Sequence, residues 1–125
     1  MEPCFLSKTD RFFIHVPKNA GTAIVKQLGS GPIGHHITIR NVPPSQRHLA
    51  IAVVRNPYDR VISLYQYCKT LNSYWHSEKD PPPLYDYCST HTFEEFVRDL
   101  CSGKFENTDW HFKPQWFWLL DEQGK

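Results

Sequence analysis

The sequence predicts an α/β fold in which a parallel sheet is flanked by helices. Two strand–turn–helix units carry this prediction, one over residues 12–28 and one over residues 49–69. Each unit begins with an apolar run typical of a buried parallel strand, turns near a proline, and continues with apolar residues at helical spacing. Two such units imply right-handed crossovers, with ligands at the carboxyl ends of the strands. We expect a single domain over residues 1–125.

Composition limits the class of protein. At 125 residues, with 40% hydrophobic and 14% aromatic residues, the chain is long enough for one folded domain with a core. The formal charge of +1, from 14 basic and 13 acidic residues, leaves no electrostatic footprint for nucleic-acid binding. No apolar segment approaches membrane-spanning length, and the first residues lack the features of a signal peptide. If the chain is complete at its start, we expect it to be cytoplasmic.

The cysteines give no sign of a metal site. They are widely spaced, without the pairs typical of zinc ligands. Free thiols are therefore expected, although the sequence leaves a disulfide between Cys88 and Cys101 open.

The first unit is predicted to be a strand, a tight loop and a helix. Residues 12–16 are aromatic and β-branched, and Pro17 ends the strand because it has no N–H to donate. We expect Gly21 to allow a turn that a side chain would forbid, and Thr22 to cap the helix. The helix N-terminus then offers N–H groups to a phosphate or sulfate, and Lys18 adds an ammonium group.

The second unit repeats this plan. Residues 49–54 form the strongest predicted strand, a continuous apolar run expected to be buried on both faces. Pro57 can open the next helix, which we expect to end near Lys69. Arg55 presents a planar fork suited to phosphate, and Ser63 can donate a hydroxyl group from the helix. The pattern predicts a second anion site at the end of a neighbouring strand.

The remaining segments predict one more helix. Thr92 and Glu95 form a capping box at its start. Residues 72–91 are predicted to be a long irregular loop, and residues 1–11 a lead-in to the first strand. Residues 110–120 are strongly apolar and are expected to pack against the fold.

Together the two anion sites resemble those of sulfotransferases that use 3′-phosphoadenosine 5′-phosphosulfate (PAPS). Pro-Lys-x-x-Gly-Thr at residues 17–22 resembles their 5′-phosphosulfate loop, and differs from the Walker A order, in which Lys follows the second Gly. Arg-Asn-Pro at residues 55–57, followed by Arg, Ser and Tyr, looks like their 3′-phosphate motif with Asn replacing the commoner Asp. His-Ile-Thr at residues 36–38 and His-x-x-Pro-Gln at residues 111–115 look like further elements of the branch with carbohydrate 2-O-sulfotransferases.

The resemblance implies a P-loop NTPase-like sulfotransferase fold. Such domains usually continue after the Pro-Gln element with a further strand and closing helices, so we expect this chain to match the N-terminal and central part of one. Eukaryotic relatives in the Golgi carry a membrane anchor. The lack of one here suggests a bacterial, viral or trimmed member of the branch.

The implied reaction is sulfuryl transfer from PAPS to an acceptor hydroxyl, with a carbohydrate as the expected acceptor and without a metal. Lys18 would neutralise the 5′-phosphate as it leaves, and Arg55 and Ser63 would hold the 3′-phosphate. The expected donor-binding residues are Lys18, Asn19, Ala20, Gly21, Thr22, Ala23, Arg55 and Ser63.

A general base must accept the acceptor's proton, and histidine suits neutral pH best. His36 is the first candidate and His35 the second, because the resemblance places paired histidines before the second strand in the position of the catalytic base. A loop histidine without a chemical role stays an alternative. His15 and Arg60 are expected to be structural.

Two other functions stay open. One is a nucleotide or nucleoside kinase with a degenerate P-loop, which would bind ATP and Mg²⁺; the absence of Gly-Lys-Ser/Thr argues against it. The other is a non-catalytic nucleotide-binding remnant or fragment, which would keep the phosphate sites without turnover.

Overall fold

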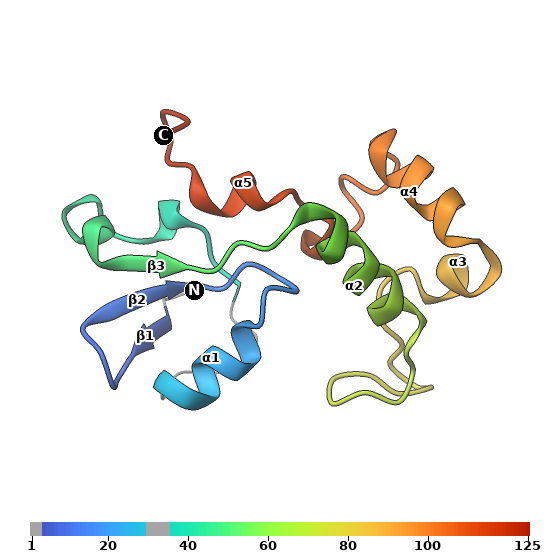
Figure 1. Ribbon diagram of the computed structural model, residues 1–125, viewed down its shortest axis with the longest axis horizontal. Helices are drawn as coiled ribbons and strands as arrows, with labels where there is room; N and C mark the ends of the chain where they lie inside the picture. Colours follow the sequence, from blue (N-terminus) through green and yellow to red (C-terminus); the bar gives the residue numbers. More distant parts are fainter. Residues whose placement is uncertain (1–3, 30–35) are drawn as a thin grey trace. The chain divides into compact units, whose positions relative to one another are not determined.

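The computed structural model describes residues 4–29 and 36–125 of the chain (Figure 1). These residues form two compact units. The first takes the described residues of Met1–Arg55 together with Pro114–Lys125, and the second is Asn56–Lys113. None of the helices formed by the described residues has the length and apolar character needed to cross a membrane.

A three-stranded mixed sheet organises the first unit. Its strands are β1 (Cys4–Leu6), β2 (Arg11–Ile14) and β3 (Ala50–Ala52), in the spatial order β1-β2-β3. β3 runs parallel to β2, with Phe13 opposite Ile51, as the two strand–turn–helix units predicted. β1, however, runs antiparallel to β2. The expectation of a parallel sheet throughout is therefore wrong, because part of the expected lead-in forms a strand.

β1 is too short to show a sequence pattern. It contains three residues, and its last side chain, Leu6, is fully buried. The turn that follows is closed by Thr9, whose backbone N–H and hydroxyl group both donate to the carbonyl oxygen of Leu6, at 2.8 and 3.1 Å. A local turn and one buried leucine therefore place a strand where periodicity predicts none.

Helices cover both faces of this sheet. The helical segments of the first unit are α1 (Gly21–Leu28), α5 (Gln115–Leu119) and the 3₁₀ turns η1 (Ile39–Asn41) and η2 (Pro44–Leu49). Phe13 packs with Leu6 and with Val25 of α1, whereas Ile14 packs with Trp118 of α5 on the opposite face. Figure 1 shows α1 and α5 on opposite sides of the sheet. Successive side chains of β2 thus enter different cores, as the two-residue period of a strand requires.

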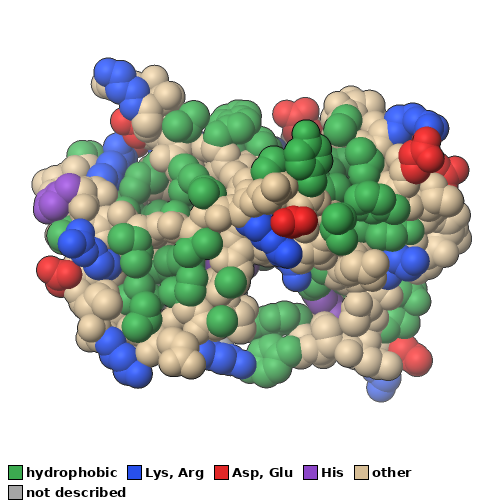
Figure 2. Space-filling view, viewed as in Figure 1, with side chains coloured by type: hydrophobic (Ala, Val, Ile, Leu, Met, Phe, Trp, Pro, Cys, Tyr) green, Lys and Arg blue, Asp and Glu red, His purple; other side chains and the backbone are tan. Residues whose placement is uncertain are grey.

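The second apolar run is less buried than the sequence predicted. Ala50 packs against the core that contains Ile14, but Ile51 is 39% exposed and Val54 is 61% exposed. Burial on both faces is therefore wrong for residues 49–54. The physical reason is position, because among the described residues β3 lies at the edge of the sheet and pairs only with β2. Figure 2 shows hydrophobic side chains at the surface among charged ones.

The second unit is helical. Its elements are α2 (Pro57–Lys69), α3 (Tyr85–Thr90), α4 (Phe93–Cys101) and the 3₁₀ turn η3 (Trp110–Phe112). The predicted bounds of α2 are confirmed, and Asn56 caps it by accepting the N–H of Tyr58 at 2.9 Å. The predicted capping box of α4 is also confirmed, since Thr92 and Glu95 bond each other's backbone N–H groups at 3.2 and 2.7 Å. The sequence missed α3 because it is one short helix after a proline run.

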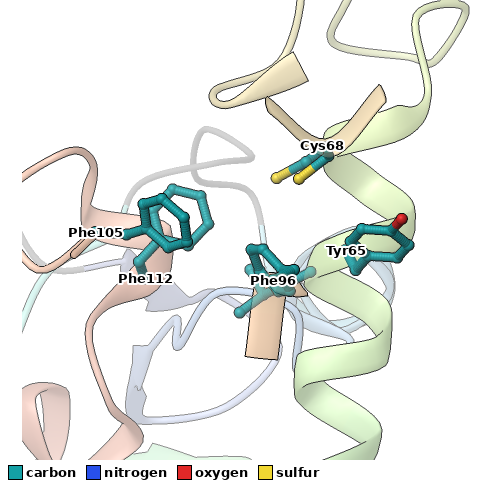
Figure 3. Close-up of a cluster of buried hydrophobic side chains, with 7 residues drawn as sticks. Tyr65, Cys68, Phe96, Phe105 and Phe112 are labelled. Carbon is teal, nitrogen blue, oxygen red and sulfur yellow. The ribbon is translucent and has the colours of Figure 1, made fainter. Parts of the chain in front are cut away.

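Aromatic rings and two thiols fill the core of this unit. α3 and α4 both contact α2. The buried cluster consists of Leu64, Tyr65, Cys68, Cys88, Phe96, Phe105 and Phe112. Figure 3 shows two sulfur atoms together at the edge of this cluster, one of them labelled Cys68. The unit therefore has a hydrophobic core of its own. Full burial of one such aromatic side chain stabilises the folded state by about 2 kcal/mol.

Three of the four cysteines have side chains that the structure describes, and these thiols are free, as the sequence predicted. Cys68, Cys88 and Cys101 form no disulfide. The alternative bridge between Cys88 and Cys101 is therefore not formed. The Cys88 thiol instead forms a hydrogen bond with Cys68.

Candidate functional site

The loop between β2 and α1 has a strained backbone. Lys18 and Ala20 both have left-handed conformations, with φ of 65° and 61°. Neither is a glycine, and a left-handed conformation costs an ordinary residue roughly 1 kcal/mol or more. Two such residues within one short loop need a surrounding structure that holds them. Backbone strain of this kind clusters at binding and catalytic sites, so the loop is the first candidate for function.

Asn19 supplies part of that surrounding structure. Its side chain is 3% exposed, and Nδ2 donates to the carbonyl oxygen of Val53 and to Oε1 of Gln115, each at 2.8 Å. The carbonyl belongs to the segment after β3, and the glutamine begins α5. The sequence predicted Asn19 as a donor-binding residue, but its side-chain amide holds the loop to its two neighbours.

The loop leads directly into the N-terminus of α1. Ala20 is the N-cap, and it makes no side-chain capping bond. The first bond within the helix joins the N–H of Ile24 to the carbonyl oxygen of Ala20, at 3.1 Å. The preceding amides, those of Gly21, Thr22 and Ala23, therefore lie at the positive end of the helix without partners inside it. Because the first turn contains no acidic residue, this end can attract an anion.

The turn predicted at Gly21 and the helix cap predicted at Thr22 are both wrong. Thr22 is a first-turn residue of α1, because the N-cap lies two positions earlier. Gly21 is not among the described glycines with positive φ. A Cβ atom at Gly21 would instead lie 1.9 Å from the ring of His15. Glycine is thus required for close approach of an imidazole ring rather than for a special turn.

His15 and His36 pack beside this helix start. His15 is buried, as the expectation of a structural role required, and the two imidazole rings are 4.0 Å apart. Nδ1 of His36 lies 2.7 Å from the carbonyl oxygen of His15. Since a carbonyl oxygen only accepts hydrogen bonds, Nδ1 must carry a proton, and in the neutral ring Nε2 is the basic nitrogen. His35, the second candidate base, lies outside the described residues.

Arg55 lies against the same loop. Its guanidinium group donates through Nη1 to the carbonyl oxygen of Lys18, at 3.2 Å. Lys18 and Arg55 are 37 positions apart in the chain. The structure therefore brings the predicted 5′-phosphate loop and the predicted 3′-phosphate arginine together within the first unit.

Ser63 belongs to the second unit. It lies half-buried on α2, one turn from Arg60. Arg60 is 6% exposed and donates to the carbonyl oxygens of Lys113 and His111, at 3.2 and 3.3 Å. Burial lowers the pKa of Arg60 to about 10, so the side chain stays protonated at neutral pH. The structural role predicted for Arg60 is confirmed, with backbone carbonyls as its partners.

The predicted site did not include Gln115. Its side chain bonds both the N–H and the carbonyl oxygen of Arg55, at 2.9 and 2.8 Å. The sequence signal was present, because Gln115 closes the His-x-x-Pro-Gln element, but the element carries no information about its partners. Only long-range contacts link it to residues 55 and 19.

Comparison with known proteins identifies one family. A family model described as the sulfotransferase family matches residues 4–119. No curated protein and no solved structure matches the chain.

Proposed function

Because the chain belongs to the sulfotransferase family, we propose that it transfers a sulfuryl group from PAPS to an acceptor hydroxyl group, with a carbohydrate as the acceptor. The observation that carries this proposal is the strained loop at Lys18 and Ala20, which enters a helix start without acidic residues beside Arg55. Preformed loops of this kind suit phosphate and sulfate groups, since their amides need no rearrangement on binding.

The first role in this proposal is binding of the donor's 5′-phosphosulfate. Lys18 and the amides of Gly21, Thr22 and Ala23 would surround it, and the hydroxyl group of Thr22 can add a donor. When the sulfuryl group leaves, negative charge grows on the 5′-phosphate. Fixed N–H groups and one ammonium group stabilise that charge, which lowers the barrier for transfer.

Selection of the 3′-phosphate falls to Arg55 and Ser63. The planar guanidinium group of Arg55 can bind a phosphate through two hydrogen bonds, and its position beside Lys18 supports this role. Ser63 would contribute a hydroxyl group from α2. Recognition of this phosphate would favour PAPS over adenine nucleotides without a 3′-phosphate.

His36 is the proposed general base. Its Nδ1 proton is held by the carbonyl oxygen of His15, so Nε2 is oriented and basic. Nε2 would accept the proton of the acceptor hydroxyl as the oxygen attacks sulfur. His35 remains the second candidate for this role.

The decisive experiment is calorimetric titration with adenosine 3′,5′-bisphosphate, the product left by PAPS, beside ATP with Mg²⁺. We expect binding of the bisphosphate with a dissociation constant on the order of 1 μM, about −8 kcal/mol. Lys18→Ala should abolish this binding, whereas Lys8→Ala, which removes an exposed lysine elsewhere in the first unit, should not. ATP–Mg²⁺ binding in place of the bisphosphate would favour a kinase.

Turnover separates the enzyme from a non-catalytic remnant. The purified chain would be incubated with PAPS and a panel of oligosaccharides, and the masses of the products would be measured by mass spectrometry. A gain of one sulfate group supports the proposal. Bisphosphate binding without any transfer would support a nucleotide-binding remnant.

A further inference from the structure

The side chain of Gln115 pairs with Arg55 as a peptide group would. Oε1 accepts the N–H of Arg55 at 2.9 Å, and Nε2 donates to the carbonyl oxygen of the same residue at 2.8 Å. Two hydrogen bonds to one residue define both its position and its orientation. The backbone of Arg55 is therefore fixed although the residue is exposed.

The hydrogen bonds between Gln115 and the backbone of Arg55 take the place of strand pairing beyond the end of β3. The strand β3 stops at Ala52, three residues before Arg55. Beyond a strand, backbone groups need partners from elsewhere. Asn19 provides one for Val53, and Gln115 provides two for Arg55. Side-chain amides thus hold the segment that carries the phosphate-binding arginine.

The same glutamine also holds the phosphate loop. Oε1 of Gln115 accepts Nδ2 of Asn19 at 2.8 Å while it accepts the N–H of Arg55. The guanidinium group of Arg55 completes the circuit by donating to the carbonyl oxygen of Lys18. Hydrogen bonds therefore link Asn19 to Gln115, Gln115 to Arg55 and Arg55 to Lys18, and the peptide bond between Lys18 and Asn19 closes a ring that spans both predicted anion sites. A ring of this kind fixes the spacing of its members better than separate contacts do.

Gln115 is held in place by the helix α5, which is anchored in the core. It is the first residue of α5, and Trp118 in the same helix is 2% exposed. The indole packs with Ile14 and Val16, which lead into the loop. Movement of Gln115 would therefore require repacking of the core beneath the loop.

We propose that Gln115 is a positioning residue that sets the spacing between the 5′-phosphate loop and Arg55, and thereby the preference for nucleotides with a 3′-phosphate. This inference rests on the proposed function, because it assigns Arg55 to the 3′-phosphate. It adds that Gln115, to which the proposed function gives no donor contact, decides how well both phosphates are held at once.

The test compares two ligands on matched variants. Gln115→Met keeps the length of the side chain and removes its hydrogen bonds, and Gln46→Met makes the same change on an exposed glutamine of η2. Calorimetry measures affinity for adenosine 3′,5′-bisphosphate and for adenosine 5′-phosphate. We expect Gln115→Met to lower the ratio of the two affinities about tenfold, as loss of one to two hydrogen bonds would. Gln46→Met should leave the ratio unchanged.

Gln115→Glu serves as a second variant if Gln115→Met fails to fold. A carboxylate still accepts the N–H groups of Arg55 and Asn19, but it cannot donate to the carbonyl oxygen of Arg55. We expect a lowered affinity ratio here as well, with a Tm near that of the wild type. In the background of Arg55→Ala, either change at Gln115 should no longer alter the ratio, because the residue that it positions has lost its side chain.

The outcomes separate this inference from the proposed function. Equal losses for both ligands, together with a lower Tm, would mean that Gln115 is merely structural and would overturn the inference. An unchanged ratio in Gln115→Met would also overturn it, while the proposed function would stand. If the wild type binds no bisphosphate, the proposed function fails first and the inference fails with it.

Discussion

The carbonyl oxygen of His15 lies 2.7 Å from Nδ1 of His36 and so determines which ring nitrogen of His36 is basic. The two residues are 21 positions apart, and their rings lie 4.0 Å from each other. A backbone carbonyl that orients an imidazole ring is a common arrangement for a general base. The ring of His15 also contacts Gly21, so the oriented imidazole is near the start of α1.

Replacement of His36 tests its proposed role as a base. His36→Ala should lower the turnover number for sulfuryl transfer about 100-fold or more, because a positioned base contributes that much. Affinity for adenosine 3′,5′-bisphosphate should change little. Added imidazole should restore part of the activity, and His48→Ala, on an exposed histidine, is the control. Turnover equal to the wild type in His36→Ala would exclude His36 as the base.

Gly21→Ala tests the close approach of the His15 ring. The added Cβ would lie 1.9 Å from ring atoms, so we expect a loss of about 3 kcal/mol in the free energy of unfolding by urea. Gly124→Ala is the control, because a Cβ there meets nothing within 4 Å and its positive φ costs only about 1 kcal/mol. Gly21→Ala should lower the free energy of unfolding by less in a His15→Ala background, because the ring is no longer there. Equal costs in both backgrounds would contradict the explanation.

The raised pKa of Tyr67 predicts that the folded protein loses stability at alkaline pH. Burial, with smaller contributions from Cys68, Asp109 and Asp80, raises the pKa of Tyr67 to about 12. A tyrosine in an unfolded chain ionises near pH 10, so the folded state binds the proton more tightly. The resulting stability is fully present below about pH 10 and is lost as the pH rises towards 12.

Urea unfolding at a series of alkaline pH values measures this loss. Tyr67→Phe should flatten the decline between about pH 10 and 12, because no phenol remains to ionise at that position. Tyr74→Phe, on a ring that is 75% exposed, controls for removal of a phenol. A decline as steep in Tyr67→Phe as in the wild type would show that Tyr67 is not its source.

The cysteines should differ in reactivity. Cys101 is exposed, whereas Cys68 and Cys88 are fully buried. A hydrogen bond with Cys68 lowers the pKa of the Cys88 thiol, but a buried thiol still cannot meet a reagent. Brief labelling of the native protein with iodoacetamide should modify Cys101 and leave the other two until urea is added. Peptide mapping by mass spectrometry measures the extent of labelling at each cysteine. Rapid labelling of Cys88 would contradict its burial in the packed core.

Much of the local structure was predictable because its causes lie within a few residues. Asn56 and Pro57 begin α2, and Thr92 and Glu95 begin α4, through hydrogen bonds that span two or three positions. Such bonds form wherever the residue types and spacing occur. The same reasoning failed for α3 and β1, which are too short to show a period.

The candidate site was predictable in part. Lys18, Arg55 and His36 were named from sequence, and the structure places them in one unit with hydrogen bonds that link their segments. The reason predicted for Gly21 was wrong, because the glycine is required by the ring of His15 rather than by a turn. The hydrogen bond from Asn19 to Gln115, 96 positions away, was not predicted. Spacing within a motif does not reveal such partners.

The sequence by itself determined where α2 and α4 begin, and its motifs pointed to the family to which the chain belongs. The tertiary structure decided that the sheet is mixed, that β3 lies at an edge with Val54 exposed, and that Gln115 joins Asn19 to Arg55. The difference has a physical cause. Capping and periodicity act over about four residues. The contacts of Gln115 join segments 60 to 96 positions apart, and strand order and burial depend on how the whole core packs.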